Sequence, residues 1–393
     1  MESSKLNNRI PLFCFVTLVF WFSMYTCVPI LTAYLKDLGA SNRMAGLIVG
    51  MYGLSQMLLR IPVGVLSDKF HKRKVFILFG LIFSILSGAG ILISQNVTWI
   101  LVLRALAGAA AATWVDFTIL FTSYFLKEET SKAIGTISFY NMTGQMLGIL
   151  CGGWFADQFS WQSSFLIGAV VGGAGLLVGF FIVERFDEKA QSITTKAVLQ
   201  VASDKVLLTV SFLAILSQLL TFATVFGFTP VFAQSLGATK FDMGLLTFFS
   251  TCPSAIAAWV GGGYLTYKFG EKKVVITGFV LTGIFTLSIP FTSSIWMLIL
   301  TQALAGIGRG IVNPILMSLS IKDVDPGKRS TAMGFYQAIY GLGMFVGPLM
   351  MGILGDWLTL KQGFILIGLV GCITAGLSQI MIKEAKVSNK MTA

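Results

Sequence analysis

The sequence carries few charges for its length. Asp, Glu, Lys and Arg together make up 11% of the 393 residues, whereas soluble domains contain about 25%. A chain this poor in charge cannot cover a water-soluble surface, which excludes a soluble enzyme, and it is too apolar for a disordered protein. One histidine and five cysteines show no spacing typical of a metal centre or a disulfide framework. We therefore expect no metal and no cofactor.

Apolar residues fill most of the chain instead, at 55% of the composition. A membrane-spanning helix needs roughly 20 of them in succession. Runs of this size occur at 10–33, 44–66, 74–95, 98–123, 132–156, 162–183, 206–233, 242–265, 274–294, 296–319, 330–356 and 362–382. The sequence thus predicts an all-α membrane protein with 12 transmembrane helices as two six-helix pseudo-symmetric bundles, residues 1–184 and 205–393, joined by a cytoplasmic central loop at 185–204.

Basic residues are distributed unevenly between the loops. Most of the 28 Lys and Arg residues fall in segments on the side of the N-terminus, and the loops on the other side hold only Lys36, Arg43, Lys240 and Lys361. Positive charge accumulates on the cytoplasmic side, so we expect a multi-pass protein of the cell membrane with both termini in the cytoplasm. The net charge of +11 then reflects topology and attraction to anionic lipids. We expect the lipid bilayer and no nucleic acid as partner, and a monomer.

The two halves of the chain resemble each other. Segments at 37–41, 69–75 and 105–108 recur, in the same order, at 235–239, 268–274 and 303–306. Two parallel six-helix repeats are typical of transporters whose substrate site lies near the membrane midplane between the halves. This pattern favours a transporter over a receptor. No Walker A, HExxH or GxSxG motif is present, so we expect that this protein is not an enzyme.

A basic loop joins spans 2 and 3, with the sequence Gly64-Val-Leu-Ser-Asp68-Lys-Phe-His71-Lys-Arg73-Lys. Gly64 would permit close packing, and Asp68 could face a helix N-terminus of the other half. This loop resembles the G-x-x-x-D-[RK]-x-G-[RK]-[RK] signature of the major facilitator superfamily, except that His71 stands where the family has Gly. The resemblance implies that Gly64, Asp68 and Arg73 form a gating loop that latches the halves in one state. A purely topological role for the basic run is the alternative.

Spans 4, 5 and 11 add to this resemblance. Arg104 begins a small-residue stretch that is similar to the family's span-4 motif, which is associated with proton coupling. The glycine repeat of span 5 resembles the motif of drug–proton antiporters, although Ile149 replaces its proline, and the proline occurs in span 11 instead. Close helix packing is the alternative explanation for both glycine repeats. The helix-packing residues are Gly144, Gly148, Gly152, Gly347 and Pro348.

Ionisable residues inside a span are functional candidates. Arg309 lies roughly 20 Å along span 10, near the midplane, and Asn313 follows one turn later, so both are candidates for substrate binding or coupling. Asp116 in span 4 could carry a proton, or it could pair permanently with Arg60 or with Arg73. These alternatives stay open at the level of the sequence.

The spans contain more buried arginine than acid, and this bears on the substrate. In the family that the chain resembles, spans 1, 4, 7 and 10 line the cavity; spans 1 and 7 offer Tyr25 and Gln218 but no carboxylate. We therefore expect a small organic substrate that is neutral or anionic. The resemblance favours proton-coupled export by alternating access, with sodium as a possible coupling ion. Uptake or exchange of a small organic anion or sugar-like solute, and lipid flipping, are the alternatives.

Overall fold

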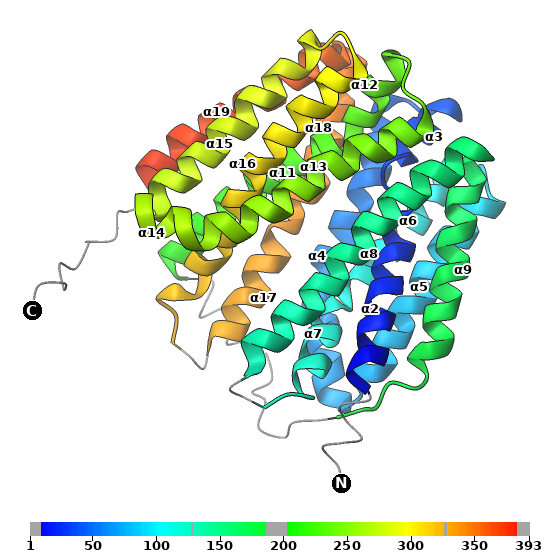
Figure 1. Cartoon of the computed structure of the whole chain (residues 1–393), viewed down its shortest axis with the longest axis vertical. Helices are drawn as coiled ribbons and strands as arrows, with labels where there is room; N and C mark the ends of the chain where they lie inside the picture. Colours follow the sequence, from blue (N-terminus) through cyan, green and yellow to red (C-terminus); the bar gives the residue numbers. More distant parts are fainter. Residues whose placement is uncertain (1–8, 127–128, 186–202, 326–327, 383–393) are drawn as a thin grey trace, which may run out of the picture.

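The computed structural model describes residues 9–126, 129–185, 203–325 and 328–382 and is helical in both halves (Figure 1). The first half contains α2 (Arg9–Tyr25), α3 (Leu31–Asp37), α4 (Asn42–Phe70), α5 (Arg73–Ile93), α6 (Val97–Ala112), α7 (Trp114–Thr122), α8 (Thr130–Gln158) and α9 (Trp161–Gly179). The second half contains α11 (Lys205–Ala223), α12 (Thr229–Ser235), α13 (Lys240–Val260), α14 (Thr266–Phe269), α15 (Glu271–Ser288), α16 (Ile295–Lys322), α17 (Arg329–Ile339), α18 (Gly341–Trp357) and α19 (Leu360–Met381).

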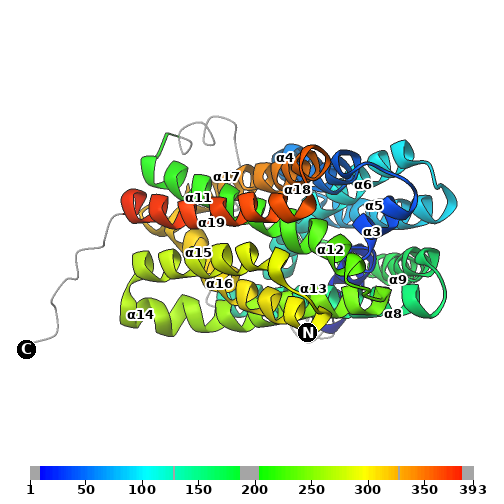
Figure 2. The same cartoon turned by 90° about the horizontal axis from the view of Figure 1, so that it is seen from above.

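Ten helices within the described residues are long and apolar enough to cross a membrane. The shorter apolar helix α2 and the 29-residue α8 pack against each other, and both contact α9, so twelve helical segments occupy the positions that the sequence predicts. Figure 2 shows the helices of the first half gathered on one side and those of the second half on the other. Of the predicted central loop at 185–204, residues 186–202 lie outside the described part of the chain.

The backbone confirms the internal repeat in detail. The first helix of each half is interrupted at an equivalent place, at 26–30 between α2 and α3 and at the π-helical turn Thr224–Phe228 between α11 and α12. A second π-helical turn, Gly261–Leu265, joins α13 to α14. A π-helical turn accommodates one extra residue in an α-helix. This insertion coincides with the one-residue increase in offset between the segments at 37–41 and 69–75, an increase that is lost again at 105–108.

The glycine repeats of α8 and α18 lie against helix backbones. A Cβ atom at Gly148 would lie 2.6 Å from the carbonyl oxygen of Phe22 in α2, and Cβ atoms at Gly144 and Gly152 would also overlap the backbone of the chain around α2. Gly347 meets the carbonyl oxygen of Leu219 in α11 in the same way. Helix α8 therefore packs closely against α2 in the first half, and α18 packs closely against α11 in the second half. Pro348 lies within α18.

The halves meet at one end of the molecule and diverge at the other (Figure 1). We call the end where the described chain begins at Arg9 the terminal face. At the opposite face, Gly46 of α4 touches the carbonyl of Pro348, and Gly153 of α8 touches Gly244 of α13, with a Cβ at Gly153 only 3.0 Å from the Gly244 Cα atom. These two contacts seal the interface between the halves on the side away from the terminal face.

One expectation from the sequence needs correction. A Cβ at Gly64 would meet only a Val115 methyl group at 3.9 Å, so Gly64 makes no close helix contact in this conformation. The predicted spans 98–123 and 330–356 correspond to the spans Val97–Thr122 and Thr331–Trp357, within which local breaks at Thr113 and Tyr340 separate α6 from α7 and α17 from α18. The break at Thr113 coincides with a hydrogen bond from its hydroxyl to the Ala110 carbonyl oxygen at 2.7 Å.

Candidate functional site

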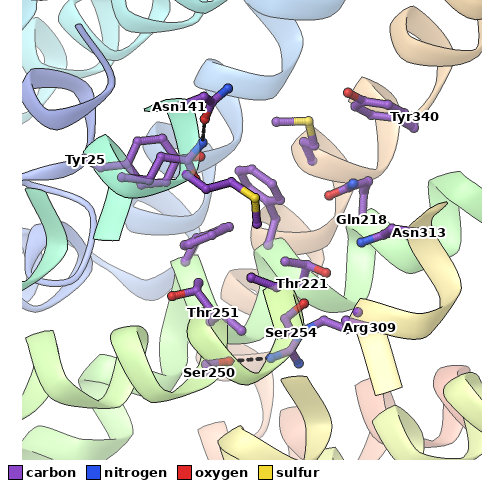
Figure 3. Close-up of a pocket in the computed structure, with 18 of the residues that line it drawn as sticks. Tyr25, Asn141, Gln218, Thr221, Ser250, Thr251, Ser254, Arg309, Asn313 and Tyr340 are labelled. Carbon is purple, nitrogen blue, oxygen red and sulfur yellow. Dashed lines mark hydrogen bonds between the residues drawn. The ribbon is translucent and has the colours of Figure 1, made fainter. Parts of the chain in front are cut away.

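A cavity of about 400 Å³ lies between the two halves, on the terminal-face side of both seals. The residues of α4 and α13 that line it follow the sealing residues along each helix, from Tyr52 to Arg60 and from Ser250 to Ala258. Four of the residues expected from the sequence line this cavity (Figure 3), namely Tyr25, Gln218, Arg309 and Asn313. These predicted residues come from the first, seventh and tenth of the spans that the family resemblance implied would line the cavity, whereas the span-4 candidates Arg104 and Asp116 do not line it.

Arg309 is the charged centre of the second-half wall. Its side chain is buried, at 4% exposed, and one guanidinium nitrogen donates a hydrogen bond to the hydroxyl of Ser250 on α13. The Nη1 atom is buried and has no hydrogen-bond partner. Among the described residues that line the cavity there is no Asp or Glu. A guanidinium with one neutral partner is thus left without a counter-charge in a buried position.

Neutral polar groups surround Arg309. Asn313 lies one turn further along α16 and accepts a hydrogen bond of 3.0 Å from the Ser217 hydroxyl on α11. Gln218 and Thr221 of α11 and Ser254 of α13 also face the cavity (Figure 3). This wall offers hydroxyl and amide groups that can both donate and accept hydrogen bonds.

The wall contributed by the first half contains a cluster of aromatic side chains. The rings of Trp21 and Trp114 lie edge to face with centroids 5.4 Å apart, and Tyr25 contacts Trp21 at 5.9 Å. Tyr25 also meets Phe226 of the second half at 6.0 Å, so that aromatic contacts cross between the halves. The side-chain amides of Gln145 and Asn141 on α8, which are hydrogen-bonded to each other, add polar groups to this wall.

Arg60 lines the cavity closer to the terminal face. Its Nη1 atom donates to the side-chain oxygen of Gln337 at 3.0 Å and to the Tyr340 hydroxyl at 3.3 Å, and both partners belong to the second half. The pairing of Arg60 with Asp116, one of the alternatives from the sequence, does not occur. Arg60 instead links the two halves through neutral oxygens.

Arg104 lies outside the main cavity. Its guanidinium carbon is 5.1 Å from the centroid of the Tyr52 ring, and Nη1 approaches the sulfur of Cys27 at 3.8 Å. Tyr25 and Tyr52 line both the main cavity and the small adjoining pocket that Arg104 lines. Two tyrosine rings therefore separate the span-4 arginine from the space that a substrate can occupy.

Asp116 belongs to a buried ion cluster near the terminal face. Arg73 donates to Asp116 at 3.3 Å and also pairs with Asp68. The carboxylate of Glu184 accepts hydrogen bonds from the backbone N–H groups of Arg73 and Lys74, at 3.1 and 2.8 Å, and so fixes the start of α5. Of the sequence-based alternatives for Asp116, the structure shows the pair with Arg73. Asp68 faces this cluster within its own half and not a helix of the other half.

Several cavity residues were not found from the sequence. Ser250, Asn141 and Gln145 are neutral polar residues on largely apolar helices, and no motif or charge distinguishes them from helix-packing polar residues. Ser250 could have been singled out only by assigning a partner to Arg309. Gln56 and Trp114 line the cavity as well. The signal for Gln56 is its position one helical turn before Arg60 on α4, and the signal for Trp114 is its position directly after the break in span 4.

An all-helical membrane protein built from two parallel repeats, with a polar cavity between them, has the architecture of a transporter. The family model described as Major Facilitator Superfamily matches residues 13–239 and 210–390. The chain therefore belongs to this superfamily, as its loop and glycine motifs indicated. It is a multi-pass membrane protein and a secondary transporter, not an enzyme.

Relatives with a named activity are distant. The chain is 26% identical over 348 residues to a multi-drug resistance efflux pump PmrA homolog of Lactococcus lactis, with 86% of each chain covered. It is 28% identical over 337 residues to multi-drug resistance efflux pump PmrA of Streptococcus pneumoniae, with 83% of this chain and 84% of the other covered. Multidrug resistance protein MdtG of Citrobacter koseri is 25% identical over 369 residues, covering 89% and 87%.

Solved structures share the fold. A bacterial homolog of the human lysosomal transporter Spinster, in an inward-facing and unoccupied conformation, superimposes with a TM-score of 0.79 at 15% identity and covers 96% of both chains. A mutant of the nucleoside transporter NupG gives a TM-score of 0.78 at 14% identity, covering 96% of this chain and all 100% of the other. At these identities the likeness establishes the architecture alone, which confirms the predicted two-bundle fold.

Proposed function

We propose that this protein exports a small organic solute, neutral or anionic, in exchange for protons by alternating access. One observation carries this proposal. The cavity between the halves contains Arg309 and no acid among its described lining residues, and the two glycine seals described above both lie on its side away from the terminal face. The similarity to multidrug efflux pumps supports export. The distribution of basic loop residues supports a cytoplasmic terminal face, so the described conformation would receive its solute from the cytoplasm.

The roles of the other charged groups follow from their positions. We assign Arg104, behind Tyr25 and Tyr52, to coupling rather than to solute contact. We assign a gating role to the loop residues Asp68 and Arg73, as the family resemblance implies, because they lie near the terminal face, which must close when the opposite face opens. Asp116 is the proton carrier in this scheme, since one of its oxygens, Oδ2, lacks a hydrogen-bond partner in the described structure.

The test measures proton movement in liposomes that contain the purified protein. Anionic, neutral and cationic solutes are added singly under an imposed pH gradient, with Arg309→Ala beside the native protein. We expect one class of solute, anionic or neutral, to discharge the gradient, and Arg309→Ala to abolish the discharge while remaining folded. Lys322→Gln is the matched control, because it removes one positive charge from the same helix but at an exposed pair with Glu271.

The outcomes separate the alternatives. If solutes equilibrate without moving protons, the protein is an exchanger, a uniporter or a sodium-coupled carrier, and the coupling roles of Arg104 and Asp116 are wrong. A clear preference for cationic solutes would contradict the substrate class. Equal loss of activity in Lys322→Gln would show that the Arg309 effect is not specific to the cavity.

A further inference from the structure

The two walls of the cavity differ in chemistry, and this difference restricts the shape of the substrate. Hydroxyl and amide groups of the second-half wall surround Arg309, whereas the first-half wall contains the aromatic cluster Trp21, Tyr25 and Trp114 beside its own polar residues. Figure 3 shows Tyr25 on the far side of the cavity from Arg309, Ser250 and Ser254. A ligand that touches both walls therefore needs a polar end and an apolar body.

The polar end must satisfy Arg309. Burial of a guanidinium is unfavourable unless an anion or several hydrogen-bond acceptors compensate it. Arg309 has only the Ser250 hydroxyl, and Nη1 has no partner. An anionic group would satisfy this nitrogen with a charge-assisted hydrogen bond, and carboxylates and similar anions fit guanidinium geometry with two oxygens.

No acid of the described structure competes for this position. The carboxylates Asp68 and Asp116 are both engaged by Arg73, in a cluster that lines no part of the cavity. The second arginine of the cavity, Arg60, is bound to Gln337 and Tyr340. Two guanidinium groups and no carboxylate give the cavity a positive potential, which selects anions over cations.

The neighbours of Arg309 can complete an anion site. Ser254 lies one turn after Ser250 on α13, and Asn313 lies one turn after Arg309 on α16, so these side chains share the faces that line the cavity. Each has a donor group that can reach a second oxygen of a bound anion. The aromatic wall opposite favours a flat, apolar body, because stacked and edge-on ring contacts are stabilising.

We propose that the substrate is an amphipathic organic anion, bound with its anionic group on Arg309 and Ser250 and its aromatic or apolar body against Trp21, Tyr25 and Trp114. This proposal rests on the proposed transport function, whose substrate class it narrows to anions. It assigns the anionic group of the substrate to Arg309 of the second half and the body of the substrate to an aromatic cluster of the first half.

The test uses three probes that share one ring system and differ in charge: 2-naphthoate, 2-naphthamide and 2-naphthylmethylammonium. Binding of each radiolabelled probe to the purified full chain in lipid nanodiscs is measured by equilibrium dialysis. We expect naphthoate to bind best. Arg309→Gln should weaken naphthoate binding by about tenfold or more and leave naphthamide binding nearly unchanged, while Arg309→Lys retains most of the preference for the anion.

Two further variants keep the result interpretable. Ser250→Ala removes a partner of Arg309 without removing charge, so we expect a smaller loss that is again confined to naphthoate. Lys322→Gln removes an equal charge from the same helix at an exposed position, and it should leave binding of all three probes unchanged. The folded state of each variant is checked by size-exclusion chromatography before binding is measured.

The proposal is overturned if the cationic probe binds best, if Arg309→Gln weakens naphthoate and naphthamide equally, or if native protein shows no saturable naphthoate binding. These results would leave the transport function open, because neutral or cationic solutes could still move protons in the liposome assay. Conversely, anion-selective binding without any coupled proton movement would support the anion site and contradict proton-coupled export.

Discussion

The two halves of this transporter share a backbone plan but not a distribution of charge. The helix breaks at 26–30 and 224–228 coincide in the repeat, whereas Arg104 corresponds to Gln302 and Arg309 corresponds to Ala111. A half-bundle therefore folds with or without an arginine at either position. Glycine contacts and helix breaks are therefore features of the repeated fold, whereas the buried charges of Arg104 and Arg309 are each present in one half only.

The glycine contacts offer the strongest test of what the halves have in common. Gly148→Leu and Gly347→Leu each place a side chain where only 2.6 Å or less separates a Cβ from a backbone carbonyl oxygen. Overpacking of this kind costs about 1–3 kcal/mol where side chains can move, and more where the obstacle is backbone. We expect both variants to lose most of the monodisperse folded protein, measured by size-exclusion chromatography of membrane extracts.

Matched controls exist in both halves. Gly173 of α9 and Gly376 of α19 have open space where a side chain would extend, so Gly173→Leu and Gly376→Leu should keep their yield of folded protein. If Gly148→Leu proved harmless while Gly347→Leu did not, the two helix pairs would not be equivalent, and the structural part of the comparison would fail.

The symmetric features were largely predictable from sequence, and the asymmetric contacts were not. Glycines four residues apart on a predicted helix indicate close packing directly, and the rise and period of a helix placed Arg309 and Asn313 on one face near the midplane. The pairing of Asp116 was undetermined, because Arg60 and Arg73 are equally plausible partners along the chain and only the packing of α5 against α7 selects Arg73. Ser250 carried no signal, because a serine on an apolar helix usually bonds its own backbone.

The ion clusters provide the sharpest contrast between the halves. Asp116 is fully buried beside Arg73 in the first half, whereas Lys322 and Glu271 form a partly exposed pair in the second. Removing one member of a buried pair costs about 3–5 kcal/mol, and an exposed pair contributes about 0–1 kcal/mol. Because Arg73 keeps Asp68 as a partner in Asp116→Asn, we expect a loss of stability below that buried-pair range. We expect Lys322→Gln to lower the thermal unfolding temperature less still.

The double variant Asp116→Asn with Arg73→Gln tests the cation that the two acids share, because it also leaves Asp68 without the guanidinium that pairs with it. We expect it to be less stable than Asp116→Asn alone. The same variants bear on coupling. Full proton-driven transport by Asp116→Asn would contradict the proton-carrier role and leave the cluster a purely structural latch of the first half.

The smallest expected effect concerns a contact that both halves make across the opposite face. Asp356 at the end of α18 accepts hydrogen bonds of 2.9 and 2.8 Å from the backbone N–H groups of Asn42 and Arg43, at the start of α4. The equivalent Asp157 of α8 accepts one bond of 3.1 Å from the N–H of Lys240, at the start of α13. Carboxylates at helix N-termini are stabilising by about 0.3–1 kcal/mol each.

Because these bonds join the halves only while the opposite face is closed, Asp356→Asn and Asp157→Asn should raise the population open at that face. The doubly bonded Asp356 should have the larger effect, and the shift should shrink at high salt. Distances between spin labels at the exposed positions Asp37 and Phe291, one in each half, would report the shift in a cysteine-free background. An equal effect of both variants would show that the helix dipole outweighs the number of hydrogen bonds, and no effect would show that the glycine contacts alone hold the face closed.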